Sequence, residues 1–266
     1  MDLTDALTAD QASRVRFFPE IDSTNDAAIA LAIDGAPEGT TVIADAQHAG
    51  RGRRGRSWFS PPGAGIYVSV VRRPISREEW ELVTLAAGVA AARAVTATTG
   101  LPVELKWPND LVTGRPWRKL GGVLCESVGG TNPHGAAGIE TIVAIVIGVG
   151  INVRATAFPP ELADRATSVE TELGRAIDRA PLIADFLRQL TAVLDSLRGG
   201  DRRAICEAWR QLASSCLGGV VRWQEQGQDR TGVARDIDEY GALIVDTADG
   251  RARIVSGEVI WERLPS

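Results

Sequence analysis

The hydrophobic positions of the chain follow two periods, which predicts a protein that mixes strands with helices. Short apolar runs, many of them β-branched and bounded by glycine or proline, are typical of buried strands. Such runs lie at residues 15–18, 40–46, 66–71, 103–107, 119–127 and 141–149. Residues typical of helix starts and ends predict helices at residues 23–34 and 76–99, and apolar residues at helical spacing predict helices at 181–197 and 201–215. No helix separates the last three strands, so we expect them to pair as an antiparallel meander.

Polar and glycine-rich stretches mark where these elements end. Ser23 has the chemistry of a helix N-cap, and Ser76 with Glu79 has the spacing of a capping box. The first 13 residues are polar, and we expect them to be frayed. The glycine-rich residues 129–138 predict an exposed hairpin loop between the last two strands of the meander.

The pattern changes after Cys216, where Gly218 and Gly219 predict a hinge. Beyond this point, short segments of alternating apolar and polar residues are separated by turns. These segments lie at residues 220–224, 232–236, 242–246, 252–255 and 259–261. So small a unit is close to the minimum for independent stability, and we expect a small β-barrel that leans on the larger domain. The sequence therefore predicts two domains, at residues 1–217 and 218–266.

Composition places the chain among ordinary folded proteins and argues against a membrane-spanning or a secreted protein. Of its 266 residues, 44% are hydrophobic and 24% are charged. The apolar run at residues 142–151 is shorter than the ~20 residues of a bilayer span, and the acidic N-terminus lacks the apolar core of a secretory signal. We therefore expect a cytoplasmic protein that does not enter membranes.

The cysteines and histidines argue against a metal site. Cys125, Cys206 and Cys216 have no CxxC spacing and are typical of buried thiols in a reducing compartment. The two histidines, His48 and His134, are far apart in the sequence. This scarcity argues against a histidine-based metal site and against a Ser-His-Asp hydrolase.

The basic residues are placed unevenly along an acidic chain. The net charge is −5, yet residues 46–77 hold seven arginines and no acid, so the rest of the chain carries −12 (−5 minus 7). A local cationic segment in an acidic protein predicts a specific anion site, with a flexible basic loop as the alternative. Of the 29 basic residues only Lys106 and Lys119 are lysines, which indicates positions where a compact ammonium is needed.

Residues 50–58, GRGRRGRSW, concentrate the chemistry of this anion site. Glycine permits backbone angles that turn amides inward, and the four arginines supply forked donors suited to carboxylate and phosphate. Trp58 follows as a stacking surface for a base. The segment has neither the ending of a Walker loop nor a dinucleotide fingerprint. A disordered RNA-binding tract is the alternative, although this is a single short unit between two predicted strands.

Six motifs stand in an order that is specific to one family. They are STN at 23–25, Gln47, GRGRRGRSW at 50–58, KWPND at 106–110, KLGG at 119–122 and GVGIN at 148–152. With these motifs the chain resembles the biotin protein ligases, of the class without an N-terminal DNA-binding domain, from about residue 15 to its end. Both lysines of the chain fall within the motifs.

The resemblance implies an α+β fold. Its catalytic domain is expected to be a mixed, largely antiparallel sheet flanked by helices, similar to class II aminoacyl-tRNA synthetases and biotin synthetases, followed by a small C-terminal SH3-like β-barrel. It also implies a reaction in two steps. Biotin and ATP, with Mg²⁺, give biotinyl-5′-AMP and pyrophosphate, and the biotinyl group then passes to a lysine on the biotin carboxyl carrier domain of a carboxylase. The adenylate is itself activated, so no enzyme nucleophile is required.

The family motifs also imply roles for individual residues. Lys119 is expected to bridge the biotin carboxylate and the α-phosphate, with Arg51 and Arg53 as further cations and Asp110 as the base for the acceptor amine. The residues expected to bind biotin are Ser23, Thr24, Asn25, Gln47, Gly50, Arg51, Gly52, Arg53, Lys119, Gly121 and Gly122. Those expected to bind the nucleotide are Arg53, Arg54, Arg56, Trp58, Lys119 and Asn152. Mg²⁺ is expected to be held mainly by the phosphates of ATP, with Asn152 as a further ligand.

Several alternatives stay open at this point. Ser23 and Thr24 can serve as a helix cap, and Asp110 has Lys106 as a structural partner. A lipoate–protein ligase shares the core, a non-catalytic biotin-binding module is a further interpretation, and a DNA-binding repressor is not expected. A monomer and a weak homodimer are both open.

Further expectations concern two loops. Residues 50–58 are expected to be disordered without ligand, since their like charges repel until an anion arrives. Residues 153–169 are expected on the adenine side but match no motif, so no contact is assigned to them or to residues 129–140.

Overall fold

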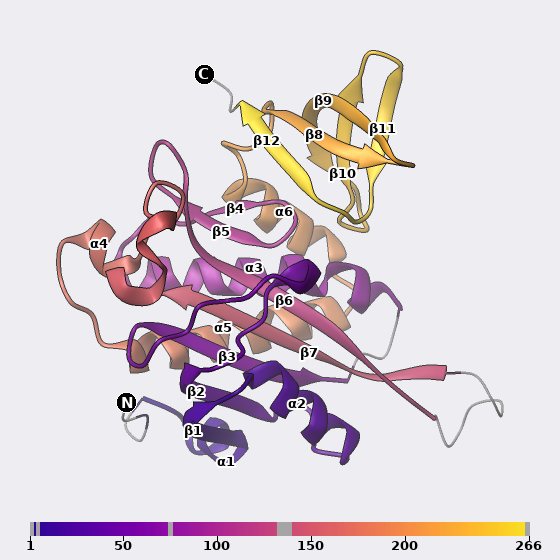
Figure 1. Ribbon diagram of the computed structural model, residues 1–266. Coiled ribbons are helices and arrows are strands. Elements are labelled where there is room, and N and C mark those ends of the chain that lie inside the picture. The colour runs from indigo at the N-terminus through magenta and orange to yellow at the C-terminus, as the bar shows by residue number, and fades with distance from the viewer. Residues whose placement is uncertain (1–2, 4–5, 74–76, 132–139, 264–266) are drawn as a thin grey trace.

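The computed structural model describes residues 3, 6–73, 77–131 and 140–263. Within these residues the strands form one seven-stranded and one five-stranded sheet (Figure 1). The helices are α1 (Ala9–Arg14), α2 (Thr24–Ile33), α3 (Arg77–Thr99), α4 (Val169–Leu173), α5 (Arg179–Arg198) and α6 (Arg202–Leu212). The strands are β1 (Val15–Ile21), β2 (Thr41–Gln47), β3 (Gly65–Arg72), β4 (Glu104–Lys106), β5 (Asp110–Thr113), β6 (Arg118–Thr131), β7 (Glu140–Asn152), β8 (Val220–Glu225), β9 (Gln228–Ile237), β10 (Leu243–Thr247), β11 (Gly250–Ile254) and β12 (Val259–Arg263).

The larger sheet has the strand order β1-β2-β3-β7-β6-β5-β4. β1 and β2 are parallel, because α2 carries the chain back between them. The other neighbouring pairs in the described part of this sheet are antiparallel. The predicted meander is confirmed with one additional strand, since β5 lies between β4 and β6. The prediction of a mixed, largely antiparallel sheet flanked by helices is likewise confirmed.

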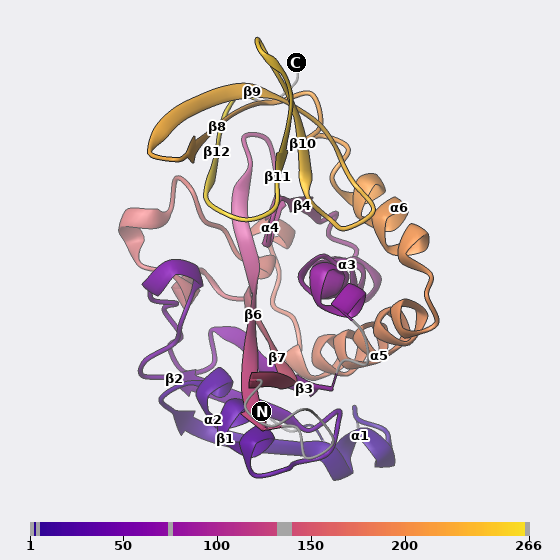
Figure 2. The ribbon, with the colours of Figure 1, turned by 90° about the vertical axis from the view of Figure 1, so that its right-hand side faces the viewer.

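Helices cover both faces of this sheet. Side chains alternate along a strand, so Val42 and Val146 pack with α2 whereas Ile43 and Ile147 pack with the cluster around α3. Figure 2 shows α2 on one side of the sheet and α3 with α5 on the other. Among the described helices, α3 has the length and apolar composition of a membrane span, and 72% of that stretch lies buried inside the protein.

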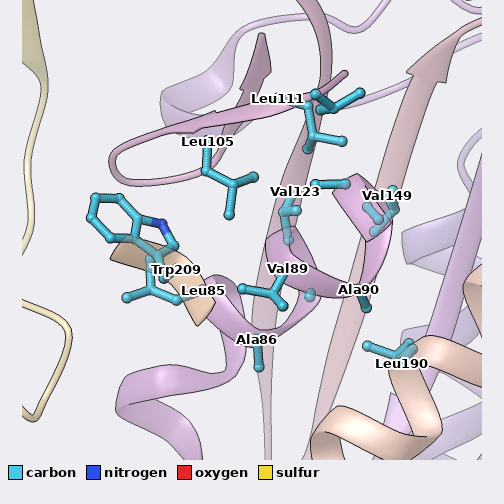
Figure 3. Close-up of a cluster of buried hydrophobic side chains, with 14 of the residues drawn as sticks. Leu85, Ala86, Val89, Ala90, Leu105, Leu111, Val123, Val149, Leu190 and Trp209 are labelled. Atoms are coloured by element: carbon cyan, nitrogen blue, oxygen red, sulfur yellow. The ribbon is translucent and has the colours of Figure 1, made fainter. Parts of the chain in front are cut away.

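The main core lies between α3 and the sheet. Figure 3 shows Val89 of α3 beside Val123 of β6 and Val149 of β7, with Leu85 near Trp209 of α6. These side chains are almost fully buried, so they hold α3 firmly under the strands whose ends carry the motifs.

The C-terminal residues form an antiparallel sheet with the strand order β11-β10-β9-β8-β12. In the described residues no pairing joins β11 to β12, so these hydrogen bonds leave the sheet open. The sheet is tied to the larger domain by the Trp107 indole, which donates to the Gly241 carbonyl at 2.9 Å. A Cβ at Gly241 would lie 2.8 Å from Leu85 Cδ1, so this turn packs directly against α3.

Some local structures differ from the expectations of the sequence. The residues predicted to fray contain α1, which begins with a capping box formed by Thr8 and Gln11. β5 and α4 were not predicted, because the two apolar residues of β5 are adjacent and do not alternate, and α4 is shorter than two helical turns. β6 extends to Thr131, into the predicted hairpin loop, and β7 begins at Glu140, one residue before the predicted strand. The capping residue Ser76 and residues 132–139 of that loop lie outside the described residues.

Candidate active site

A cavity of about 330 Å³ brings together the residues that the motifs selected. Its walls come from the N-terminus of α2, residues 50–58, the turn between β4 and β5, the neighbouring strands β6 and β7, and residues 157–166. Glu258 adds a wall residue from the C-terminal sheet. Every residue that we expect to bind biotin or the nucleotide lines this cavity, except Gly50 and Gly121.

The N-terminus of α2 presents polar side chains that already have partners. Ser23 caps the helix, since its hydroxyl accepts a hydrogen bond from the Asp26 amide at 3.3 Å. The amide and hydroxyl of Thr24 donate to Gln47 Oε1 at 2.9 and 3.0 Å. The helix-cap interpretation therefore describes Ser23, whereas Thr24 joins α2 to the end of β2.

Asn25 is tied to the sheet behind it. Its Nδ2 donates to Glu126 Oε2 at 2.7 Å, and its Oδ1 accepts from the Ser69 hydroxyl at 2.6 Å. Gly148 of β7 lies against the same side chain, because a Cβ there would be 2.1 Å from Asn25 Oδ1. The position of Asn25 thus depends on a glycine at 148.

Residues 50–58 fold back on themselves beside the cavity. The Gly52 amide donates to the Arg56 carbonyl at 2.7 Å, and the Trp58 amide donates to the Gly50 carbonyl at 2.7 Å. A Cβ at Gly50 would lie 2.4 Å from the Trp58 carbonyl oxygen, so Gly50 closes the base of the turn instead of facing the cavity. That this segment orders only when a ligand binds stays a prediction.

The first two arginines of the segment tie it to the larger domain. Arg51 Nη2 lies 2.5 Å from Asp26 Oδ1 and 2.8 Å from Glu126 Oε2. Arg53 Nη1 donates to Asn109 Oδ1 at 3.1 Å. Burial lowers the pKa of the Arg53 guanidinium below its ordinary value. Both cations therefore stand at the cavity with protein partners that an anionic ligand can replace.

The other two arginines pair with the C-terminal sheet. Arg54 Nη1 lies 3.4 Å from Glu258 Oε2, and Arg56 pairs with the second oxygen of the same carboxylate. The two guanidiniums are 56% and 69% exposed, so solvent weakens both pairs. Arg54 and Gly55 have φ of 60° and 73°, and this left-handed turn directs the two side chains toward Glu258.

Trp58 packs against β7 at a position that only glycine permits. A Cβ at Gly150 would lie 2.7 Å from both Cε2 and Nε1 of the Trp58 ring. The Lys119 ammonium lies 5.5 Å from the ring centroid, within the range of a cation–π contact. In the described residues Trp58 Nε1 is buried without a protein hydrogen-bond partner.

Asp110 holds both lysines of the chain. Its Oδ1 lies 2.5 Å from Lys119 Nζ, and its Oδ2 lies 3.5 Å from Lys106 Nζ. The β4–β5 hairpin pairs Lys106 directly with Asp110, whereas Lys119 comes from β6. The two lysines that composition singled out therefore meet at one carboxylate that is 18% exposed.

Comparison with known proteins assigns this arrangement to a family. Residues 17–152 match the model of the Biotin/lipoate A/B protein ligase family, and residues 220–261 match the Biotin protein ligase C terminal domain. The chain belongs to the biotin/lipoate A/B protein ligase family. The biotin–[acetyl-CoA-carboxylase] ligase of Mycobacterium tuberculosis is 36% identical over 250 residues, which cover 91% of this chain and 86% of that protein.

Further relatives agree with this assignment. The bifunctional ligase/repressor BirA of Bacillus spizizenii is 35% identical over 243 residues, which cover 90% of this chain and 71% of that protein. The biotin protein ligase from Aquifex aeolicus in complex with biotin and ATP has a similar structure, with a TM-score of 0.79 and 28% identity over 94% of this chain and 99% of that one. The resemblance to biotin protein ligases is thereby confirmed.

In this member of the family, two adjacent glycines have different surroundings. A Cβ at Gly121 would lie 2.7 Å from the Gly150 carbonyl oxygen, which belongs to the backbone of the neighbouring strand. A Cβ at Gly122 would lie 3.5 Å from Lys119 Nζ, at the cavity. Gly121 is therefore required by strand packing, and the space beside Lys119 is provided by Gly122.

Asn152 of this family member is buried, and its side chain supports the chain that follows β7. Its Nδ2 donates to the Thr167 carbonyl at 3.0 Å. Thr167 in turn donates its amide to the Lys119 carbonyl at 2.9 Å. Asn152 and Thr167 thus join the chain after β7 to the strand of Lys119, and the contact of Asn152 with phosphate or Mg²⁺ stays a prediction.

The motifs did not select three acidic residues that contact the arginines. Glu126 could be found from β6, because it follows Gly122 and Leu124 at every second position and shares their face. Asp26 comes directly after the STN motif. Glu258 has no sequence signal, because it is far along the chain from Arg56.

The stretch at residues 153–169, to which the motifs assigned no contact, contains one apolar wall of the cavity. Residues between β7 and α4 contribute it through Ala157, Phe158, Pro159, Leu162 and Ala166. A backbone bridge between Lys119 and Ala166 fixes this wall beside β6.

Proposed function

We propose that this cavity joins biotin to the α-phosphate of ATP and then passes the biotinyl group to a lysine of a biotin carboxyl carrier domain. On this proposal the protein is a biotin–[biotin carboxyl carrier protein] ligase. The observation that carries the proposal is that Lys119, Arg51 and Arg53 line one cavity in a chain of this family. The names of the relatives from Mycobacterium tuberculosis and Paracoccus denitrificans support it.

The first step brings two anions together. A carboxylate oxygen of biotin attacks the α-phosphorus, and the bond from that phosphorus to the pyrophosphate oxygen breaks. Two unit charges 4 Å apart repel by roughly 4 kcal/mol at an effective dielectric of 20. Lys119, Arg51 and Arg53 offset this repulsion. Lys119 is the bridging cation, because its ammonium is compact and Gly122 beside it adds no side chain.

The two substrates occupy different parts of the cavity. The ring system of biotin lies against the N-terminus of α2, where buried amides and hydroxyls supply donors and acceptors. The adenine lies against Trp58 and the apolar wall formed by residues 157–166. The residues proposed for biotin are Ser23, Thr24, Asn25, Gln47, Arg51, Gly52, Arg53, Lys119 and Gly122. Those proposed for the nucleotide are Arg53, Arg54, Arg56, Trp58, Lys119 and Asn152.

The second step uses Asp110 as a general base. The acceptor ammonium gives one proton to Asp110, its nitrogen attacks the acyl carbon, and the bond from that carbon to the AMP oxygen breaks. The second proton of the nitrogen leaves to solvent as the amide forms. The position of Asp110 in the cavity wall, in contact with Lys119, supports this role.

We propose that Mg²⁺ enters on the phosphates of ATP, because this ion is usually bound through substrate phosphates, water and one or two carboxylates. Among the described residues there is no group of three or more His, Cys, Asp or Glu side chains that could hold a metal ion. The amide oxygen of Asn152 is the protein ligand that we propose. When bound, the ion supplies further neutralisation of phosphate charge.

The same proposal includes the domain organisation, the cellular location and the oligomeric state. We propose a class II synthetase-like catalytic domain at residues 1–217 and an SH3-like domain at residues 218–266, because β8 begins directly after the predicted hinge. The protein then acts in the cytoplasm as a monomer or weak homodimer, without DNA.

A lipoate–protein ligase is the second candidate, since the family model covers both activities. Pyrophosphate release from ATP with either biotin or lipoate separates the two. We expect release with biotin and none above background with lipoate, and Lys119→Ala should lower the biotin-dependent rate by at least about a hundredfold.

Arg203→Ala serves as the matched control with an unchanged rate, because the Arg203 side chain is 87% exposed on α6. Release with lipoate alone, or full turnover by Lys119→Ala, contradicts the proposal, and no release with either acid indicates a non-catalytic module.

A further inference from the structure

Asp110 has two cationic partners, and the proposed reaction removes one of them. Lys119 contacts Oδ1 at 2.5 Å and Lys106 lies 3.5 Å from Oδ2. In the first step of the proposed function, on which this inference rests, the Lys119 ammonium turns to the biotin carboxylate and the α-phosphate. The Asp110 carboxylate then stands beside two further anions, and it competes with them for Lys119 unless another cation stays with it.

We infer that Lys106 is a positioning residue that holds the Asp110 carboxylate through Oδ2 and so frees Lys119 for the substrates. The backbone favours this division of roles. Lys106 and Asp110 are directly paired residues of the β4–β5 hairpin, so their contact does not depend on where the Lys119 side chain points. Lys119 stands on β6, where its partner in the ladder is Val112.

The identity of the residue fits the same role. The chain uses arginine at every basic position other than 106 and 119. A guanidinium at position 106 would tend to take both carboxylate oxygens as a bidentate fork. A compact ammonium occupies one oxygen and leaves Oδ1 available, first to Lys119 and later to the proton of the acceptor amine.

The other cations near this hairpin have different partners. The guanidinium of Arg53 donates its hydrogen bond to Asn109, the residue before Asp110. Arg115 pairs with Glu104 at 2.6 Å, and Arg118 pairs with Glu172 at 2.6 Å. Lys106 is therefore the cation whose contact with Asp110 is built into the hairpin.

Adenylate formation without carrier tests this inference, measured as single-turnover pyrophosphate release from biotin, ATP and Mg²⁺. Lys106→Met should slow this step about tenfold, because Asp110 then retains Lys119. In the double variant Lys106→Met/Asp110→Asn the rate should return to within about threefold of wild type, because no carboxylate is left to capture Lys119. A merely structural role for Lys106 predicts no such recovery.

A charge-retaining variant and a surface control complete the experiment. Lys106→Arg should form adenylate within about threefold of wild type and provides the test if Lys106→Met does not fold. Arg203→Met removes an exposed charge on α6 and should leave the rate unchanged. A wild-type rate for Lys106→Met, a slow double variant, or Lys106→Arg as slow as Lys106→Met overturns the inference. A wild-type protein that releases no pyrophosphate overturns the proposed function instead.

Discussion

At the scale of single residues, glycines shape the cavity more through what packs against them than through their backbone angles. Neither Gly148 nor Gly150 has a positive φ. A Cβ at Gly148 would meet Asn25, and one at Gly150 would meet the Trp58 ring. The two glycines of GVG in the last motif are therefore explained by two side chains, Asn25 and Trp58, that pack against β7.

Alanine at two adjacent glycines should separate strand packing from ligand space. Gly121→Ala places a Cβ 2.7 Å from the Gly150 carbonyl, and we expect it to lower the free energy of unfolding by about 1–3 kcal/mol. Gly122→Ala makes ordinary contacts at 3.5 Å, so we expect stability within about 0.5 kcal/mol of wild type and a raised KM for biotin. Urea unfolding and biotin titrations measure the two effects. Equal destabilisation by both variants would contradict this difference.

At the scale of elements, residues 50–58 connect parts of the protein that are distant in sequence. Arg51 reaches α2 and β6, Arg53 reaches the β4–β5 turn, and the last two arginines of the segment reach Glu258 beside β12. The side chains of Arg54 and Arg56 are more than half exposed. The order of the segment therefore depends on polar contacts that ligands can replace.

Amide exchange should report how Glu258 and ligands hold this segment. Glu258→Gln removes the charge that Arg54 and Arg56 share, and we expect exchange in residues 50–58 to quicken a few-fold, since exposed pairs contribute little each. Biotin with ATP should slow exchange there in both proteins. Asp249→Asn, which removes an acid that is 76% exposed, is the matched control. Equal exchange with and without ligand would refute the expectation that ligand orders the segment.

At the scale of the whole molecule, we expect the scarcity of lysine to protect the protein from its own product. The proposed biotinyl-5′-AMP reacts with primary amines, and the chain offers Lys106, Lys119 and the N-terminal amine. Both lysines are partly buried and paired with Asp110. Arginine elsewhere carries positive charge without offering a nucleophile at neutral pH.

Intact mass spectrometry after incubation with biotin and ATP should therefore find little self-labelling of the wild-type chain. Arg203→Lys places an amine at a position where the native side chain is 87% exposed, and we expect this variant to gain one labelled site. Heavy labelling of the wild-type protein, or none of the added lysine, would show that lysine scarcity does not control self-labelling.

The local pattern of the chain was enough to predict most elements of the larger sheet, the long apolar α3 and the strands of the C-terminal sheet. Each of these elements carries a run or a repeat of apolar residues that stands out from its neighbours in the sequence. The contiguous motifs likewise selected most of the residues that line the cavity, since each motif supplies its own turn or strand end. The short elements β5 and α4 lack such a signal, and α1 is marked only by its capping box.

Periodicity and motifs thus gave the elements and the chemical groups of this protein, because both are properties of neighbouring residues. The packing of distant segments settled the rest: that Gly121 serves a neighbouring strand while Gly122 faces Lys119, that one carboxylate holds both lysines, and that Glu258 reaches the arginine segment. These facts depend on strand register and on the docking of the C-terminal sheet, which sequence spacing does not specify.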